Sequence, residues 1–162
     1  MSEQALRAPY SRSKRRLGND EQATWRAFIR AHATVTRRLE HELVDAGGLT
    51  LSDLDVLATL EREPSRELRL SELADRVLLT KSGVTRLVDR LESEGYLTRR
   101  VCPSDRRGQL AAVTAPGRRA LRRAMATHVR GIAAAFADHV RGDERSVLLA
   151  VLERIAAQPS GH

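Results

Sequence analysis

The sequence predicts a mainly α-helical protein that carries one short β-hairpin. Three observations predict this fold class. Aromatic residues make up only 3% of the 162 residues, so Leu, Val, Ile and Ala must supply most of the core. Apolar residues recur at steps of three and four along most of the chain, which is the period of an amphipathic helix. Two short apolar segments flank a stretch rich in turn-forming residues at positions 103–108, which is typical of a hairpin.

The first 18 residues are expected to form a flexible basic arm, in which Glu3 is the single acidic residue. Such a run is either simply solvated or follows a phosphate backbone or a minor groove. A long amphipathic helix is expected over residues 19–48, ended by Gly47 and Gly48. Its apolar face consists of Trp25, Phe28, Ile29, His32, Val35, Leu39 and Leu43.

A second helix is expected to follow at once. Thr50 is a good N-cap, and Asp53, three residues later, completes a capping box. Pro64 and Ser65 then predict a loop. Ser71 is expected to cap a short helix over residues 72–78, and a three-residue turn at 78–80 leads to the next helix.

That next helix begins after Thr80, which can cap it, and ends at Gly95. Its apolar positions recur at i, i+3, i+4 and i+7, which predicts one buried face formed by Val84, Leu87, Val88 and Leu91. The opposite face is polar and cationic, with Lys81, Ser82, Thr85, Arg86 and Arg90. Two helices joined by a tight turn, the second with such an outer face, indicate a helix–turn–helix.

The predicted hairpin follows directly. Its strands are residues 97–101 and 110–114, and its turn, residues 103–108, carries Arg106 and Arg107. After Pro116 comes a helix whose apolar positions extend from Leu121 to Val140. A last helix is expected from about Asp143 to Pro159. Its inward residues are expected to be Val147, Leu148, Val151, Leu152 and Ile155.

This order of elements predicts a winged helix–turn–helix with a two-stranded wing. The net charge of +7 and the sequence pI of about 10.8 favour a polyanionic partner, here double-stranded DNA. A helix fits the major groove, and a two-stranded ribbon reaches an adjacent groove. The expected DNA-binding residues are Thr80, Lys81, Ser82, Thr85, Arg86, Arg90, Arg106 and Arg107. A carboxylate repels phosphate, so Asp105 is expected to hold an arginine of the wing in place.

Several motifs resemble those of MarR-type repressors. They are the run from Leu70 to Ala74, the segment from Ser82 to Glu92, Gly95-Tyr96-Leu97, and the wing sequence Asp105-Arg106-Arg107-Gly108 followed by Val113-Thr114. The resemblance covers residues 49–121. It implies a homodimer on pseudo-palindromic operators, with Arg107 in the minor groove. It also implies a repressor that a small phenolic or anionic effector releases from DNA.

The expected organisation has four parts. Residues 1–18 form the arm, 19–48 a dimerisation helix, 49–115 the winged helix–turn–helix domain and 116–158 the C-terminal dimerisation helices. The apolar stripes of the terminal helices favour a dimer independently, because a small core would struggle to bury them. Trp25 is expected to pack between the first helix and its neighbours, or to line an effector pocket with His32 and Asp53.

Motifs for other functions are absent from the sequence or are weak. We find no phosphate loop, zinc-protease motif or nucleophile elbow, so we expect neither an enzyme nor a cofactor or metal. The single cysteine, Cys102, and the absence of a signal or membrane segment predict a cytoplasmic protein with no membrane partner. Two alternatives remain open at this point. One is an oxidant-sensing regulator acting through Cys102; the other is a winged-helix protein that coats nucleic acid without sequence preference.

Overall fold

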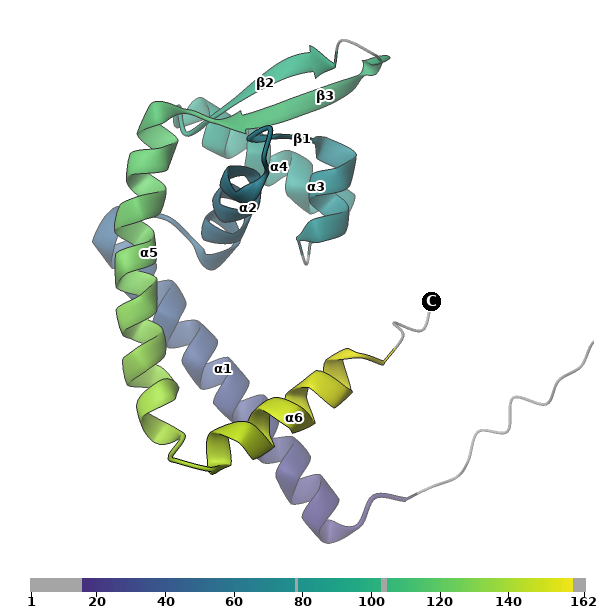
Figure 1. Cartoon of the computed structure of the whole chain (residues 1–162), viewed down its shortest axis with the longest axis vertical. Coiled ribbons are helices and arrows are strands. Elements are labelled where there is room, and N and C mark those ends of the chain that lie inside the picture. Colours follow the sequence, from purple (N-terminus) through teal and green to yellow (C-terminus); the bar gives the residue numbers. More distant parts are fainter. Residues whose placement is uncertain (1–15, 78, 103–104, 159–162) are drawn as a thin grey trace, which may run out of the picture. The chain divides into compact units, whose positions relative to one another are not determined.

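The structure of the chain is a computed structural model that describes residues 16–77, 79–102 and 105–158 (Figure 1). At Lys81, Arg106 and Arg107 it describes the backbone only. Most of the predicted arm, Leu78 of the predicted turn, the hairpin residues 103–104 and Pro159 therefore lie outside the described residues. The chain divides into two compact units, residues 1–33 and 34–162, and each is described by itself.

The first helix, α1, spans Asn19–Gly47 and ends before Gly48, whose φ is +74°. The predicted helix is therefore confirmed, but its predicted buried face is not. Only Leu39 and Leu43 are buried in α1, whereas Trp25 is 57% exposed. The physical reason is length: a helix of 29 residues extends about 44 Å, more than one small core covers. The prediction that Trp25 packs between α1 and its neighbours stays a prediction.

Three helices follow: α2 (Leu51–Arg62), α3 (Leu70–Arg76) and α4 (Lys81–Ser93). The predicted capping box of α2 is confirmed, because Thr50 Oγ1 accepts from Asp53 N at 3.1 Å and Asp53 Oδ2 accepts from Thr50 N at 2.8 Å. The prediction that Ser71 caps the short helix is wrong. Arg69 occupies the N-cap of α3 without a side-chain cap, because a strand leads straight into this helix.

The sheet has three strands rather than the predicted two. They are β1 (Glu67–Arg69), β2 (Leu97–Cys102) and β3 (Asp105–Val113), antiparallel in the order β1-β3-β2. The wing strands extend further than predicted, since β3 begins at Asp105. The register passes from Val101↔Gln109 to Cys102↔Asp105, so residues 106–108 have no partner in β2. Residues 106–108, expected in the turn, are therefore an irregularity within β3.

One face of this sheet covers the helices α2, α3 and α4 (Figure 1). The strands contribute Leu68, Leu97, Ala111 and Val113 to the core. The helices contribute, among others, Leu57, Leu60, Leu73, Val84, Val88 and Leu91. Full burial of one such Leu or Val side chain stabilises the fold by about 1.5–3 kcal/mol. The buried face predicted for α4 is thus confirmed at Val84, Val88 and Leu91, and Leu87 is partly buried.

The chain continues through α5 (Ala115–Ala135), a short 3₁₀ helix η1 (Ala137–His139) and α6 (Glu144–Ala156). In α5, Ala120, Leu121 and Ala124 join the core. No residue of α6 is buried by the described residues, so the expectation that its apolar residues point inward is not met in the single chain. None of the described helices is long and apolar enough to cross a membrane.

Candidate nucleic-acid interface

The helix α4 presents a short polar surface at its N-terminal end. Thr80 Oγ1 accepts a hydrogen bond from Gly83 N at 3.1 Å, which confirms the predicted cap. Ser82, Thr85 and Arg86 are exposed on the side opposite the buried face. The first turn of α4 contains no acidic residue, so the positive end of the helix dipole is not neutralised there. This end of α4 favours a negatively charged partner.

Arg86 supplies a free positive charge on that surface. Within residues 16–77, 79–102 and 105–158, its guanidinium makes no hydrogen bond or ion pair. Free guanidinium groups bind phosphate or the edge of a guanine in a bidentate way. Arg86 is therefore placed as the sequence predicted, and its side chain is available to a ligand.

Two carboxylates of α4, Asp89 and Glu92, are paired with an arginine of the wing. Arg99 Nη1 donates to Asp89 Oδ1 at 2.6 Å, and Arg99 Nε donates to Glu92 Oε2 at 2.7 Å. The backbone N–H of Arg99 also donates to Glu92 Oε1 at 2.9 Å. These bonds lower the pKa of Glu92 and raise the pKa of Arg99. We call this contact the α4–β2 clasp; it joins the wing to α4 and neutralises two charges that would repel DNA.

Arg90 contacts protein rather than solvent alone, unlike Arg86. It donates to Asp53 Oδ1 and, at 3.1 Å, to Glu94 Oε1. Hydrogen bonding to Asp53 is the main cause of a raised pKa for Arg90. The prediction that Arg90 binds DNA stays a prediction; in this structure the guanidinium is engaged by two carboxylates and ties α4 to the start of α2.

Asp53 is the other partner in this contact and is 0% exposed. Its second oxygen accepts from Thr50 N in the capping box. Both carboxylate oxygens are therefore engaged, and no part of the side chain reaches solvent. The predicted role of Asp53 in an effector pocket is not compatible with this conformation, in which Asp53 stabilises the fold. No sequence signal could have revealed a pair whose members lie 37 positions apart.

Further arginines join the strands of the sheet. Asp105 Oδ2 accepts from Arg69 Nη1 at 3.2 Å, so one arginine that Asp105 contacts lies on β1; the expected contact with an arginine of the wing stays a prediction. Arg100 of β2 forms a two-point ion pair with Glu67 of β1 and lowers the pKa of that carboxyl. Sequence reasoning missed Arg69 and Arg100 because it missed β1. The alternation of polar and apolar residues from Glu67 to Leu70 was the available signal.

Three predicted DNA-binding side chains cannot be placed. Lys81 lies at the first position of α4, and Arg106 and Arg107 lie in the irregular part of β3, but their side chains are outside the described atoms. The backbone alone puts both arginines on the part of β3 that extends beyond its pairing with β1, which covers residues 110–112. A projecting ribbon with two arginines is the form expected of a wing.

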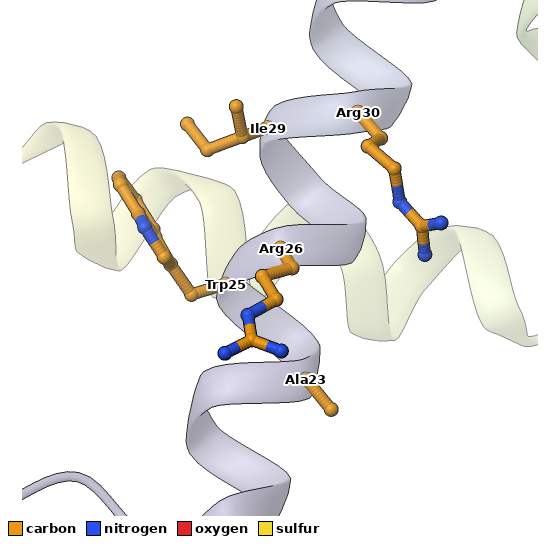
Figure 2. Close-up of a pocket in the computed structure, with 5 residues that line it drawn as sticks. All are labelled: Ala23, Trp25, Arg26, Ile29 and Arg30. Carbon is orange, nitrogen blue, oxygen red and sulfur yellow. The ribbon is translucent and has the colours of Figure 1, made fainter.

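The first unit carries an exposed aromatic row on α1. The ring centroids of Trp25 and Phe28 lie 5.9 Å apart, and those of Phe28 and His32 lie 6.4 Å apart. A hollow of about 520 Å³ is lined by Ala23, Trp25, Arg26, Ile29 and Arg30. Figure 2 shows the side chains of Trp25 and Ile29 on the same side of α1, the guanidinium group of Arg26 near Trp25, and Arg30 projecting from the other side of the helix. Apolar and cationic groups therefore adjoin each other on this helix.

Cys102 ends β2 and is 5% exposed. A buried thiol is poorly accessible to oxidants, so this location gives no support to a redox function. Within the described residues, no group of three or more His, Cys, Asp or Glu side chains could hold a metal ion.

Comparison with known proteins identifies the family. The model of the MarR family matches residues 47–108. YkoM of Bacillus subtilis, an uncharacterised transcriptional regulator of the helix–turn–helix type, is 32% identical over 133 residues, which cover 80% of this chain and 82% of YkoM. Sco3205, a MarR family regulator from Streptomyces coelicolor whose crystal structure contains DNA, is 34% identical with a TM-score of 0.84. That match covers 90% of this chain and 92% of Sco3205. The chain belongs to the MarR family.

A second Streptomyces coelicolor member of the MarR family, AbsC, is 30% identical with a TM-score of 0.81, and the match covers 88% of this chain and 95% of AbsC. The resemblance found in the motifs is thus confirmed, as is the winged fold. The chain is a DNA-binding transcriptional regulator of the MarR family, and its relatives are regulators rather than enzymes.

Proposed function

We propose that this protein acts as a homodimer on a pseudo-palindromic operator and represses transcription until a small molecule releases it. The observation that carries the proposal is the charge arrangement on α4. Among the described residues Arg86 has no carboxylate partner, while Asp89 and Glu92 further along α4 are paired with Arg99. A surface that has paired its own carboxylates and left a cation free is suited to the negative potential of a DNA groove.

In this proposal α4 enters the major groove. Thr80, Lys81 and Ser82 lie at its N-terminal end, where backbone N–H groups and the helix dipole favour phosphate. Thr85 and Arg86 lie one turn further and face base edges. Arg106 and Arg107 of the wing follow the adjacent minor groove, where a narrow groove strengthens the attraction of an arginine.

Asp105 acts in this proposal through the wing backbone. Its contact with Arg69 fixes the start of β3 against β1 and so limits the directions in which residues 106–108 can project. Arg90 is not assigned a base contact. Its role is to hold α4 in place through Asp53 and Glu94.

The dimer is proposed from exposed apolar side chains on the three terminal helices. They are Trp25, Phe28 and Ile29 of α1, Val129 and Ile132 of α5, and Val147, Leu149 and Ile155 of α6. Side chains of this size in water are unfavourable by about 25 cal/mol per Å² of apolar surface. Covering them with a second copy of the chain accounts for helices that a single chain leaves bare.

The effector is proposed to be an aromatic or anionic molecule that contacts α1 near Trp25 and His32. The hollow beside Trp25 offers an aromatic wall together with Arg26 and Arg30, a combination suited to a ring that carries a negative charge. Asp53 is left out of this proposal. A cytoplasmic location is proposed as well, because the protein must reach DNA and its thiol must stay reduced.

Single-arginine variants test this function. Arg86→Ala and Arg107→Ala should each weaken operator binding by about 1–3 kcal/mol in a gel-shift titration, with the circular dichroism spectrum unchanged. Arg154→Ala is the matched control, because it removes an equal charge from an exposed position of α6. If Arg86→Ala and Arg107→Ala bind the operator as tightly as Arg154→Ala does, α4 and the wing do not read DNA as proposed.

A further inference from the structure

Thr114 connects the end of α4 to the beginning of α5. Its hydroxyl lies 2.7 Å from Gly95 O and 3.1 Å from Tyr96 O and donates to these carbonyls. The same oxygen accepts from Gly117 N at 3.1 Å, which caps α5. The backbone N–H of Thr114 also donates to Tyr96 O, at 3.0 Å. One residue therefore bonds to the two residues that follow the C-cap of α4 on one side and to the first turn of α5 on the other.

The carbonyls that Thr114 contacts belong rigidly to α4. Gly95 ends this helix with a φ of +77°, a conformation that favours glycine. Gly95 N donates to Glu92 O at 2.9 Å, and Tyr96 N donates to Leu91 O at 2.8 Å. Both residues thus remain bonded to the helix after it turns. A movement of α4 must carry these two carbonyls with it.

Close packing at Gly117 reinforces the connection. A Cβ atom on Gly117 would lie 2.9 Å from Val113 Cγ1 and still closer to Tyr96 O. The first turn of α5 can therefore approach the end of α4 only because residue 117 has no side chain. Arg118 Nη1 donates to Val113 O at 2.9 Å and ties the same turn back to β3.

The geometry of α5 makes the angle at this joint important. A helix of 21 residues is about 30 Å long, so a rotation of about 10° at its first turn displaces its far end by about 5 Å. That displacement exceeds one base-pair step of about 3.4 Å. A dimer built through the terminal helices converts the angle between α4 and α5 into the separation of its two recognition helices.

We propose that Thr114 is a positioning residue that sets the angle between α4 and α5, and thereby the half-site spacing that the dimer accepts. The dimer and the operator in this inference rest on the proposed function. The contacts of Thr114 do not. Thr114 touches no DNA in this account and acts only through Gly95, Tyr96 and Gly117.

The test combines three variants with a series of operators. Thr114→Val keeps the shape of the side chain and removes the hydroxyl, whereas Thr114→Ser keeps the hydroxyl. Thr50→Val is the matched control, because Thr50 caps α2 with an equivalent 3.1 Å bond but lies outside the joint. Each protein is titrated against a selected operator and against the same operator lengthened at its centre by one and two base pairs.

Thr114→Val should bind the original operator about tenfold more weakly, the effect of losing about 1.4 kcal/mol, and bind the lengthened operators within about twofold of wild type. Its preference for one spacing should therefore fall about tenfold. Thr114→Ser should restore the preference, and Thr50→Val should keep it. A Thr114→Val protein with the wild-type preference, or a Thr50→Val protein that loses it equally, overturns the inference.

Hydrogen exchange tests the joint without DNA. Thr114→Val should raise amide exchange in peptides covering residues 94–97 and 114–118, and unchanged exchange there overturns the inference. If Thr114→Val does not fold, Gly117→Ala serves instead, since its Cβ forces the same joint apart. A wild-type protein that accepts every spacing equally contradicts the proposed operator and the spacing claim, while the exchange result separately decides whether Thr114 holds the joint.

Discussion

Arginine side chains in the winged unit fall into two groups according to what they contact. Arg69, Arg90, Arg99 and Arg100 each bond to a carboxylate of the protein. Arg86 does not do so among the described residues. Charge alone cannot separate these groups, because all of them have the same formal charge in the sequence. Only the positions of the carboxylates separate the arginines that pair within the protein from Arg86, which we propose contacts DNA.

Substitutions at Arg86 and Arg90 should have opposite effects on protein stability and on DNA binding. Arg90→Gln should lower the free energy of unfolding by about 2–3 kcal/mol, because it leaves the carboxylate of Asp53 buried without a cation. The effect falls short of that for a fully enclosed pair, since the Arg90 side chain is 40% exposed. Arg86→Gln should change the unfolding free energy by less than about 0.5 kcal/mol.

Urea denaturation of both variants checks this prediction. In an operator titration, Arg86→Gln should bind DNA more weakly than wild type although its stability is nearly unchanged. Equal stability losses in the two variants would show that the Asp53–Arg90 contact does not stabilise the fold. In that case Arg90 would return to the set of candidate DNA contacts.

At the scale of elements, the α4–β2 clasp keeps the wing in a fixed relation to α4. Arg99 reaches Glu92 and Asp89 from the inner side of β2, where its neighbours Leu97 and Val113 belong to the core. The sheet thus does more than support the wing. It closes the helical core on one face and positions the recognition helix by direct bonds.

The clasp predicts a loss of stability in acid. The pKa of Glu92 lies below its ordinary value of 4.5 in the folded protein, chiefly because Arg99 hydrogen-bonds its charged form. A depressed folded pKa stabilises the protein fully above the unfolded pKa, and this contribution disappears as the pH falls through the folded pKa. The free energy of unfolding should therefore decrease below about pH 4.5.

Glu92→Gln isolates this contribution, because glutamine keeps the shape and removes the titration. Unfolding curves measured from pH 6 down to pH 3 should show a shallower decline for Glu92→Gln than for wild type. Parallel declines in the two proteins would mean that the clasp makes no difference to stability.

The elements also show what the sequence could and could not predict. The caps at Thr50 and Thr80 and the buried face of α4 depend on residues within one turn, so local pattern was sufficient. The strand β1 has three residues and is stabilised by pairing with β3, far along the chain, so local pattern missed it. The Asp53–Arg90 and Asp105–Arg69 pairs likewise depend on tertiary structure. The DNA contacts expected of Lys81, Arg106 and Arg107 remain predictions.

At the scale of the whole molecule, the terminal helices carry apolar faces that the single chain leaves exposed. Periodicity correctly predicted that α1, α5 and α6 are amphipathic. It could not tell a face buried in one chain from a face that a second chain would cover, because both have the same spacing of apolar residues. Ile29 and its neighbours on α1 are exposed, which is consistent with the proposed dimer.

Ile29→Asp should weaken the dimer, because it places a charge on a face that the second copy is proposed to cover. Ala27→Asp is the control: it adds the same charge at an exposed position two residues away, on the opposite side of α1. Sedimentation velocity at micromolar concentration should report a dimer for wild type and Ala27→Asp, and a shift toward monomer for Ile29→Asp. A monomeric wild-type protein would contradict the proposed assembly.

The central claim is that the intact protein recognises a specific DNA sequence. Selection from a random duplex library, followed by titration of the selected duplex and a scrambled one at about 50 and 200 mM salt, tests it most directly. We expect the selected duplexes to share a two-fold symmetric consensus. The protein should bind this consensus about 10³-fold or more tightly than the scrambled duplex at the higher salt. Equal affinity for both duplexes, with only the steep salt dependence of counterion release, would contradict it and indicate a protein that coats nucleic acid.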